Sequence, residues 1–318
     1  MLDSLNSIEE YNTEIALCQV LFDETHTNLS MHMHQKDKMI EKLISASELI
    51  DRPPSFIQNL KDCGTLLKVD KEAHILQGNF CKARLCPVCA WKRSLRLFHE
   101  VRDIVSHIKD TDKARYIFVT LTQPNVTADN LSDELSRLMY SFKRFRQFAR
   151  IKKSAIGMIK GLEVTHNPTS NTYHPHMHVL IAVHPSYFKR GSPLYISQEE
   201  FMNLWKKATD STLDRLNVDI RAVKKGEEEK AIAEISKYTV KLSSVCESEN
   251  IEALATVMRS IHGRRMFTYS GIFRDTAKLL KIDLQASAED ETPDTITADE
   301  SGSIGYISWS KQGYKFVN

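Results

Sequence analysis

The sequence predicts an α+β fold built around an antiparallel β-hairpin. Residues 161–183 alternate along two arms on either side of a turn-forming run, residues 167–171 (NPTSN). Residues 115–122 (RYIFVTLT) have apolar side chains on both faces, which is typical of a central strand. Residues 129–150 place apolar side chains at helical spacing. Strands and helices of this kind in one chain indicate α and β layers around a common core.

The second arm of the hairpin carries a row of histidines. His174, His176 and His178 share one face of the strand, because side chains alternate between faces. With the turn centred at residues 169–170, Glu163 lies directly opposite His176, about 5 Å away at Cβ. Two imidazoles and a carboxylate at one point suit a divalent cation. The alternative is that one histidine packs in the core and the others are solvated.

Composition and charge limit the classes of protein to which this chain can belong. A length of 318 residues suggests about two domains, and 42% hydrophobic and 26% charged residues are ordinary for a soluble protein. The net charge of +2 is too small to indicate a nucleic-acid partner by itself. No apolar run has transmembrane length, and the N-terminus lacks the pattern of a signal peptide. We therefore expect a cytoplasmic protein without a membrane partner.

The N-terminal part is predicted to be helical. Residues 6–50 have helical periodicity, and Pro53-Pro54 ends the segment. It contains a second His-x-His pair, His32 and His34. Positions i and i+2 diverge on a helix and cannot share a metal, so this pair is expected to face solvent.

A cysteine cluster follows the helical segment. In a reducing compartment, clustered cysteines indicate a metal site more than disulfides, and Cys86-Pro87-Val88-Cys89 has the spacing with which two thiolates bind one zinc ion. Cys81 is a natural third ligand; Cys63 or His74 is the fourth, with Cys63 preferred because Gly64 follows it. The alternative is a set of small buried thiols. The predicted structural zinc ligands are Cys63, Cys81, Cys86 and Cys89.

Two groups of cations are candidates for DNA contact. The first directly follows the cysteines, and the second lies in the latter half of the predicted helix 129–150. In both places a solvated helix face explains the charges equally well. The candidate residues are Lys92, Arg93, Arg96, Lys143, Arg144 and Arg146.

Further elements are predicted downstream of the hairpin. Ser197 can cap a helix, and residues 218–223 (VDIRAV) alternate like a short strand. Residues 251–261 have a helical pattern and residues 264–273 a strand-like one. Residues 286–302 are acidic and read as a linker. Beyond it, the aromatic tail has the pattern of a hairpin that could dock on the main domain, mediate oligomerisation or touch DNA.

Residues 226–242 (GEEEKAIAEISKYTVKL) are predicted to form a helix with its charges arranged as the helix dipole favours. Glu234, Tyr238 and Lys241 follow one another at i, i+4 and i+7 on one stripe, and Lys237 lies at its edge. By itself this stripe indicates a tyrosine on the rim of an ordinary Glu–Lys face. Beside a metal site it also suits nucleophilic chemistry, because cations can stabilise a phenolate whose ordinary pKa is near 10.

These motifs together resemble a known family. TLTQPN (120–125), EVTHN (163–167), HPHMH (174–178) and EISKYTVK (234–241) occur in that order, downstream of the cysteine-rich CKARLCPVC (81–89). The chain from about Cys63 to Phe273 resembles the rolling-circle replication initiator (Rep) proteins of small bacterial plasmids, of the single-tyrosine type, within the HUH endonuclease superfamily. One His-x-His pair is a weak signal, whereas three motifs in order are a strong one.

The resemblance implies a fold and a mechanism. The fold would be a central antiparallel sheet of about five strands flanked by helices. Tyr238 would nick the plus strand at the double-strand origin, with Lys237 and Lys241 beside it. His176 and His178 would bind Mg²⁺ or Mn²⁺, with Glu163 or His174 as third ligand. Glu234 would activate water in the terminating cleavage.

The resemblance also implies partners, and the sequence as a whole predicts a domain order. The partners would be plasmid origin DNA, host helicase and host DNA polymerase; a homodimer is a further option. The expected segments are 1–55 (helical), 56–112 (zinc knuckle and basic helix), 113–285 (HUH nicking and joining endonuclease), 286–303 (acidic linker) and 304–318 (aromatic tail).

Three other functions compete with this interpretation. A mobilisation relaxase usually has its tyrosine before the histidines, which is the reverse of the order here. An HUH transposase is generally shorter and lacks an upstream cysteine knuckle. A non-catalytic, zinc-containing DNA-binding regulator leaves the Glu234-x3-Tyr238 spacing unexplained.

Overall fold

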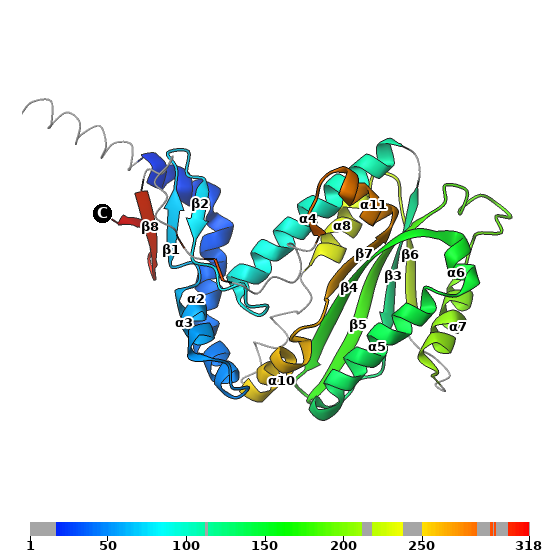
Figure 1. The fold of residues 1–318 in the computed structure, drawn as a ribbon, viewed down its shortest axis with the longest axis horizontal. Coiled ribbons are helices and arrows are strands. Elements are labelled where there is room, and N and C mark those ends of the chain that lie inside the picture. Colours follow the sequence, from blue (N-terminus) through cyan, green and yellow to red (C-terminus); the bar gives the residue numbers. More distant parts are fainter. Residues whose placement is uncertain are drawn as a thin grey trace, which may run out of the picture. The chain divides into compact units, whose positions relative to one another are not determined.

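The computed structural model describes residues 17–111, 114–211, 218–237, 250–284, 293–294, 296 and 305–317. The chain divides into two compact units (Figure 1). The first unit comprises Met1–Trp91 and Glu291–Asn318, and the second comprises Lys92–Asp290. Among the described residues, no helix is both long and apolar enough to span a membrane.

The first unit combines helices with a four-stranded antiparallel sheet. Its helices include α2 (Thr27–Glu48) and α3 (Pro54–Asp62), and the proline at the start of α3 suits a position where no backbone donor is needed. The strand order is β2-β1-β8-β9. The strands are β1 (Leu66–Val69), β2 (Ile75–Gly78), β8 (Gly305–Ser310) and β9 (Gly313–Val317). The predicted tail hairpin is present as β8–β9, and it pairs with β1 through Leu67↔Ile307.

The second unit is built on a five-stranded antiparallel sheet with the order β6-β3-β5-β4-β7. The strands are β3 (Arg115–Thr122), β4 (Ala155–Asn167), β5 (Thr172–Val183), β6 (Val218–Val223) and β7 (Phe267–Gly271). The predicted α+β class with an antiparallel sheet of about five strands is confirmed. Strands β3 and β6 have the bounds that alternation predicts, and β3 is an interior strand.

Helices cover both faces of this sheet (Figure 1). On one face lie α4 (Pro87–Asp110), α8 (Glu228–Ser236) and α11 (Ile272–Leu279). On the other lie α5 (Leu131–Phe145) and α7 (Gln198–Thr209), with α10 (Ile251–Ile261) packed against α5. Ser197 caps α7 as predicted, since its side chain accepts a hydrogen bond from the Glu200 amide. The short helices η1 (Ala128–Asn130) and α6 (Ala149–Ser154) flank α5.

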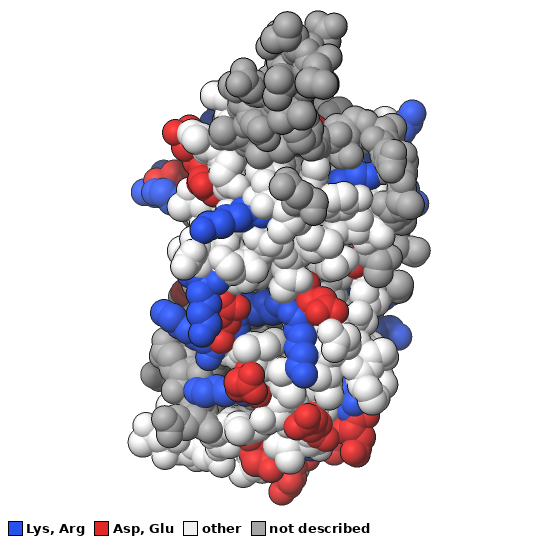
Figure 2. All heavy atoms as spheres, turned by 90° about the vertical axis from the view of Figure 1, so that its left-hand side faces the viewer, with Lys and Arg blue, Asp and Glu red and all other residues white. Residues whose placement is uncertain are grey.

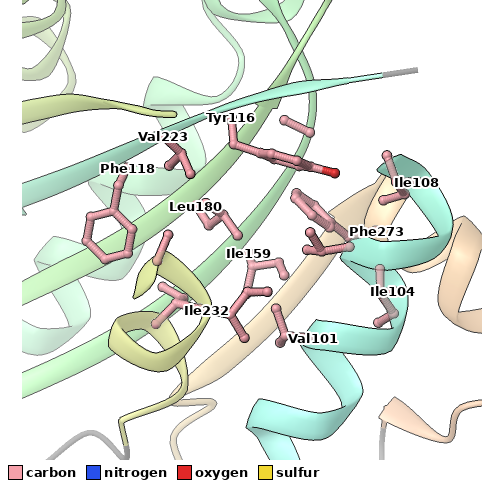
Figure 3. Close-up of a cluster of buried hydrophobic side chains, with 14 of the residues drawn as sticks. Val101, Ile104, Ile108, Tyr116, Phe118, Ile159, Leu180, Val223, Ile232 and Phe273 are labelled. Carbon is pink, nitrogen blue, oxygen red and sulfur yellow. The ribbon is translucent and has the colours of Figure 1, made fainter. Parts of the chain in front are cut away.

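The core that positions α8 lies between this helix, α4 and the sheet (Figure 3). Val101 and Ile104 of α4 meet Leu180 of β5 and Phe273 of α11. Ile232 of α8 faces the same cluster and is only 2% exposed. Ile232 therefore lies on the inward face of α8, and burial of this face holds α8 against the sheet.

Two predicted helices are shorter in the structure. Residues 129–150 are interrupted between α5 and α6, where Phe148 has the non-helical angles φ −59° and ψ 133°. The helix in residues 226–242 ends at Ser236, and Lys237 leaves it with ψ 119°. The predicted helix therefore does not continue unbroken through Lys237, and Tyr238 and Lys241 of the predicted stripe lie outside the described residues.

The predicted strand in residues 264–273 is also shorter. Strand β7 begins at Phe267 and ends at Gly271, and Phe273 belongs to α11. Gly271 makes this change of direction with a positive φ of 57°, and a side chain there would lie 2.2 Å from the Ile156 carbonyl oxygen. Only glycine fits a backbone in this conformation at such close approach.

Candidate metal centre and its surroundings

The β4–β5 hairpin brings Glu163, His176 and His178 together. Glu163 pairs directly with His176 across the two strands, as the position of the turn predicts. Their ligand atoms lie within 4.8 Å of one another. The Glu163 Oε2 atom is 3.1 Å from His178 Nε2 and 3.5 Å from His176 Nε2. All three side chains are largely buried, with 13%, 10% and 20% exposure for Glu163, His176 and His178.

Neighbouring groups orient both imidazoles. His176 Nδ1 lies 3.1 Å from the His174 carbonyl oxygen, which can only accept a hydrogen bond. With a cation bound, the ring proton would therefore be on Nδ1, which leaves the lone pair of Nε2 available to the ion. His178 Nδ1 lies 3.2 Å from the Thr120 hydroxyl on the paired strand β3, which can hold this ring in the same way. Thr120 belongs to the TLTQPN motif but is not among the site residues predicted from the sequence.

The electrostatics keep Glu163 ionised. Burial would raise the pKa of this carboxyl, but hydrogen bonds and charges from His176 and His178 outweigh burial and hold its pKa well below the usual range. An ionised carboxylate and two imidazole nitrogens are a donor set that fits a divalent cation.

His174 does not join this group of ligand atoms. Its ring stacks on His176 with centroids 5.0 Å apart, and burial lowers the pKa of His174. Of the two alternatives for a third ligand, the structure brings Glu163, rather than His174, to the His176–His178 pair.

The end of α8 lies over this part of the sheet. A Cβ placed on Gly161 would be 3.5 Å from the Ile235 carbonyl oxygen, and Gly161 is the direct strand partner of His178. Glu234 is half-buried and forms an ion pair with Arg221 of β6. Lys237, the last described residue of this segment, is exposed. Tyr238 and Lys241, which the sequence analysis singled out, lie outside the described residues.

The four predicted cysteines form a second group in the first unit. All four are buried, and the Sγ atom of Cys63 lies 3.4 Å from that of Cys89 and 3.6 Å from that of Cys86. Cys81 and Cys89 are 3.7 Å apart at Sγ. Four sulfurs about 2.3 Å from a zinc ion have edges of about 3.8 Å, so this arrangement fits tetrahedral coordination.

The chemistry around the cysteines also favours a metal. Hydrogen bonds from the other three thiols lower the pKa of Cys86, which favours a thiolate there. The buried Lys36 ammonium donates to the carbonyl oxygens of Cys63, at 2.6 Å, and Lys61, at 2.8 Å. A buried cation at this place offsets the negative charge of bound thiolates. His74, the alternative fourth ligand, lies instead 3.0 Å from Asp70 and is mostly exposed.

The candidate DNA-contact residues of α4 differ in their exposure. Arg96 is exposed and Lys92 half-buried, whereas Arg93 is only 7% exposed. On the face drawn in Figure 2, Lys and Arg side chains lie interspersed with Asp and Glu, so its described part has no large area of one charge sign. Of these three residues, Arg96 is the most exposed.

The second cation group lies on α5 and just beyond it, on the other side of the sheet from α8 (Figure 1). Lys143 is exposed. Arg144 binds Asp210 through both carboxylate oxygens, and the Arg146 guanidinium lies 5.8 Å from the Phe142 ring centroid. Arg144 is therefore engaged within the protein, while Lys143 is accessible.

Comparison with known proteins identifies the chain's relatives. The profile of the replication protein family matches residues 72–316. The chain belongs to this replication protein family of plasmid initiators. The family assignment from the sequence motifs is thereby confirmed.

Curated relatives in the family match over most of their length. "Protein rep" of Streptococcus pneumoniae serotype 2 (strain D39 / NCTC 7466) is 32% identical over 271 residues, covering 83% of this chain and 84% of the relative. "Protein rep" of a Bacillus species is 35% identical over 266 residues, covering 77% and 81%. "Protein rep" of Lactiplantibacillus plantarum is 27% identical over 300 residues, covering 88% and 94%. No solved structure matches the chain significantly.

Proposed function

We propose that this initiator starts rolling-circle replication by nicking the plus strand at the plasmid double-strand origin. The observation that carries the proposal is the Glu163–His176–His178 group, held on adjacent strands of an antiparallel sheet beside the end of α8. Membership of the replication protein family supports a role at an origin. The segment beside the histidines leads directly to Tyr238 in the sequence.

Tyr238 is the proposed nucleophile. Its phenolate oxygen attacks the scissile phosphorus, the P–O3′ bond breaks, and the leaving oxygen takes a proton to become a 3′-OH primer end. The product is a 5′-phosphotyrosine link between protein and DNA. Lys237 and Lys241 supply positive charge that stabilises the phenolate and the phosphate.

Glu163, His176 and His178 are proposed to hold Mg²⁺ or Mn²⁺. When bound, the ion supplies Lewis-acid polarisation of a phosphoryl oxygen. The protein's own contribution is to orient the ligands: the His174 carbonyl and the Thr120 hydroxyl hold the two Nδ1 atoms, so that both Nε2 atoms face the carboxylate.

Glu234 is proposed to act in termination. It accepts a proton from water, and the water oxygen attacks the phosphorus at the regenerated origin. The P–O3′ bond breaks, the leaving oxygen takes a proton to become a 3′-OH, and the other end keeps a free 5′-phosphate. The reaction then ends by hydrolysis instead of a second covalent transfer to protein. Its half-buried position on α8, on the same side of the sheet as His178, supports this role.

The remaining parts of the proposal concern zinc and partners. Cys63, Cys81, Cys86 and Cys89 hold a structural Zn²⁺ that stabilises the first unit. Exposed cations such as Arg96 and Lys143 contact origin DNA. Host helicase and DNA polymerase follow initiation, as the family resemblance implies.

Cleavage of supercoiled plasmid carrying the cognate origin tests the proposal. The reaction is run with Mg²⁺, Mn²⁺ or EDTA, and the DNA-linked peptide is recovered after protease digestion and identified by mass spectrometry. We expect a metal-dependent nick with the 5′-phosphate on Tyr238, and no protein-linked nick with Tyr238→Phe. Tight origin binding without any nick would instead favour the non-catalytic regulator.

A further inference from the structure

Glu234 has a defined partner on the sheet. Arg221 lies on β6, at the edge of the five-stranded sheet, and its guanidinium forms an ion pair with the Glu234 carboxylate of α8. The two side chains are 48% and 32% exposed, so both are accessible to solvent and to a substrate.

The guanidinium is also held by an aromatic ring. Arg221 pairs directly with Phe118 of β3, and its Cζ atom lies 4.5 Å from the centre of the Phe118 ring. Figure 3 shows this ring on the side of the sheet that carries α8. The Phe118 ring lies 5.6 Å from the His178 ring, between centroids. Arg221 therefore contacts both Glu234 and the Phe118 ring, and Phe118 in turn lies beside His178 of the candidate metal group.

Glu234 lies at a position on its helix where a negative charge benefits from a positively charged partner. Glu234 lies in the last turn of α8, which ends at Ser236. The C-terminal end of a helix disfavours negative charge, and an unrestrained glutamate samples many rotamers. A planar guanidinium seated on an aromatic ring offers fixed donors that restrict the carboxylate to one region.

We propose that Arg221 is a positioning residue that holds the Glu234 carboxylate in place for the terminating hydrolysis. The inference rests on the proposed function, because it assigns Arg221 a role only in the step that Glu234 performs. The competing explanations are a surface ion pair with little energetic effect and a direct contact between Arg221 and a DNA phosphate.

A double-mutant cycle separates these explanations. The variants are Arg221→Gln, Glu234→Gln, the pair together, and Arg221→Lys, which keeps the charge but not the planar fork. Each is incubated with supercoiled cognate plasmid and Mn²⁺. The 5′ ends of the nicked strand are then counted in two classes: protein-linked ends from Tyr238, and free 5′-phosphates from water.

We expect Arg221→Gln to lower the ratio of free to protein-linked ends by about tenfold to a hundredfold, the size of effect that a misplaced catalytic group produces. Glu234→Gln should lower it at least as much, and the double variant should resemble Glu234→Gln alone. Arg221→Lys should recover part of the ratio. Arg137→Gln is the control, because Arg137 forms an ion pair with Glu134 on α5, away from Glu234, and it should leave the ratio at the wild-type value.

Four outcomes would overturn the inference. An unchanged ratio together with the wild-type amount of nicking in Arg221→Gln would identify a surface ion pair without a role. An equal loss of both classes of ends, or a further loss in the Glu234→Gln background, would identify a direct DNA contact. Wild-type protein that makes no nick would overturn the proposed function, and this inference with it.

Discussion

At the scale of single residues, the candidate metal centre depends on the orientation of its two histidine rings. The Nδ1 atom of His176 is held by a backbone carbonyl and that of His178 by the Thr120 hydroxyl. Because a carbonyl cannot be removed by substitution, Thr120 is the one contact of this kind that mutagenesis can test.

Replacing Thr120 by valine should weaken metal binding. The change keeps the shape of the side chain but removes the oxygen 3.2 Å from His178 Nδ1, and losing such a contact typically costs about 10- to 100-fold in affinity. Calorimetric titration with Mn²⁺ measures the effect. Thr120→Ser keeps a hydroxyl and should bind nearly as the wild type; equal affinities for valine and serine would show that the contact does not matter.

Glu134 on α5 provides a prediction about pH. Burial raises the pKa of its carboxyl, and Arg137 only partly offsets this effect; the Oε1 atom is buried without a hydrogen-bond partner among the described residues. A raised pKa means that the folded protein binds this proton more tightly than the unfolded chain. The carboxylate therefore lowers stability as pH rises above its unfolded pKa of about 4.3.

Glu134→Gln should consequently stabilise the protein at neutral pH, by about 1 kcal/mol, a common size for single substitutions. The gain should disappear below about pH 4, where the unfolded and folded carboxyls are both protonated. Urea unfolding at several pH values measures it. Asp133→Asn, at an exposed neighbouring position, should give no gain at neutral pH, and a gain from Glu134→Gln that is independent of pH would contradict the explanation.

At the scale of elements, the C-terminal hairpin completes a sheet that begins more than 200 residues earlier. Strand β8 pairs with β1, and the Tyr314 hydroxyl donates to the Gly64 carbonyl oxygen at 2.6 Å. Gly64 directly follows Cys63, so the hairpin supports the backbone beside the cysteine group.

Tyr314→Phe should therefore destabilise the first unit. The variant leaves the buried Gly64 carbonyl without this donor, which costs about 1–3 kcal/mol. Thermal unfolding measures the loss. Tyr306→Phe, on the same hairpin, is the control, because no hydrogen bond of its hydroxyl is found among the described residues; an equal effect of both variants would mean that the Tyr314 bond contributes little.

At the scale of the whole molecule, the two candidate metal groups lie in different units. The first unit contains the cysteine group and both ends of the described chain, and the second contains the histidine–glutamate group. Each unit has its own sheet. Loss of zinc should therefore act mainly on the first unit.

Cys63→Ser should abolish stoichiometric zinc and lower the stability of the first unit, since structural zinc binding contributes directly to folding. Zinc content by mass spectrometry and the unfolding transition measure the two effects. Cys18→Ser, at another buried cysteine, and His74→Ala should both retain zinc. Retention of zinc by Cys63→Ser with loss in His74→Ala would reverse the ligand assignment.

The features that sequence patterns predicted are local ones. Alternation located β3 and β6, and the turn position predicted the pairing of Glu163 with His176, because strand register follows directly from a short hairpin. The C-x-x-C spacing likewise predicted the metal-like cysteine group. In each case the interacting residues are close in the chain, so few backbone conformations can join them.

Other features depended on contacts between distant segments. These features are the choice of Cys63 over His74, the docking of β8–β9 on β1, the end of α8 at Ser236, and the ion pair between Arg221 and Glu234. Local periodicity predicts each element separately and carries no information about contacts between elements. The sequence by itself determined the elements and the chemistry of the two candidate metal groups. Only the tertiary structure decided which distant side chains surround them, because those contacts arise from packing of whole elements and have no signature in local spacing.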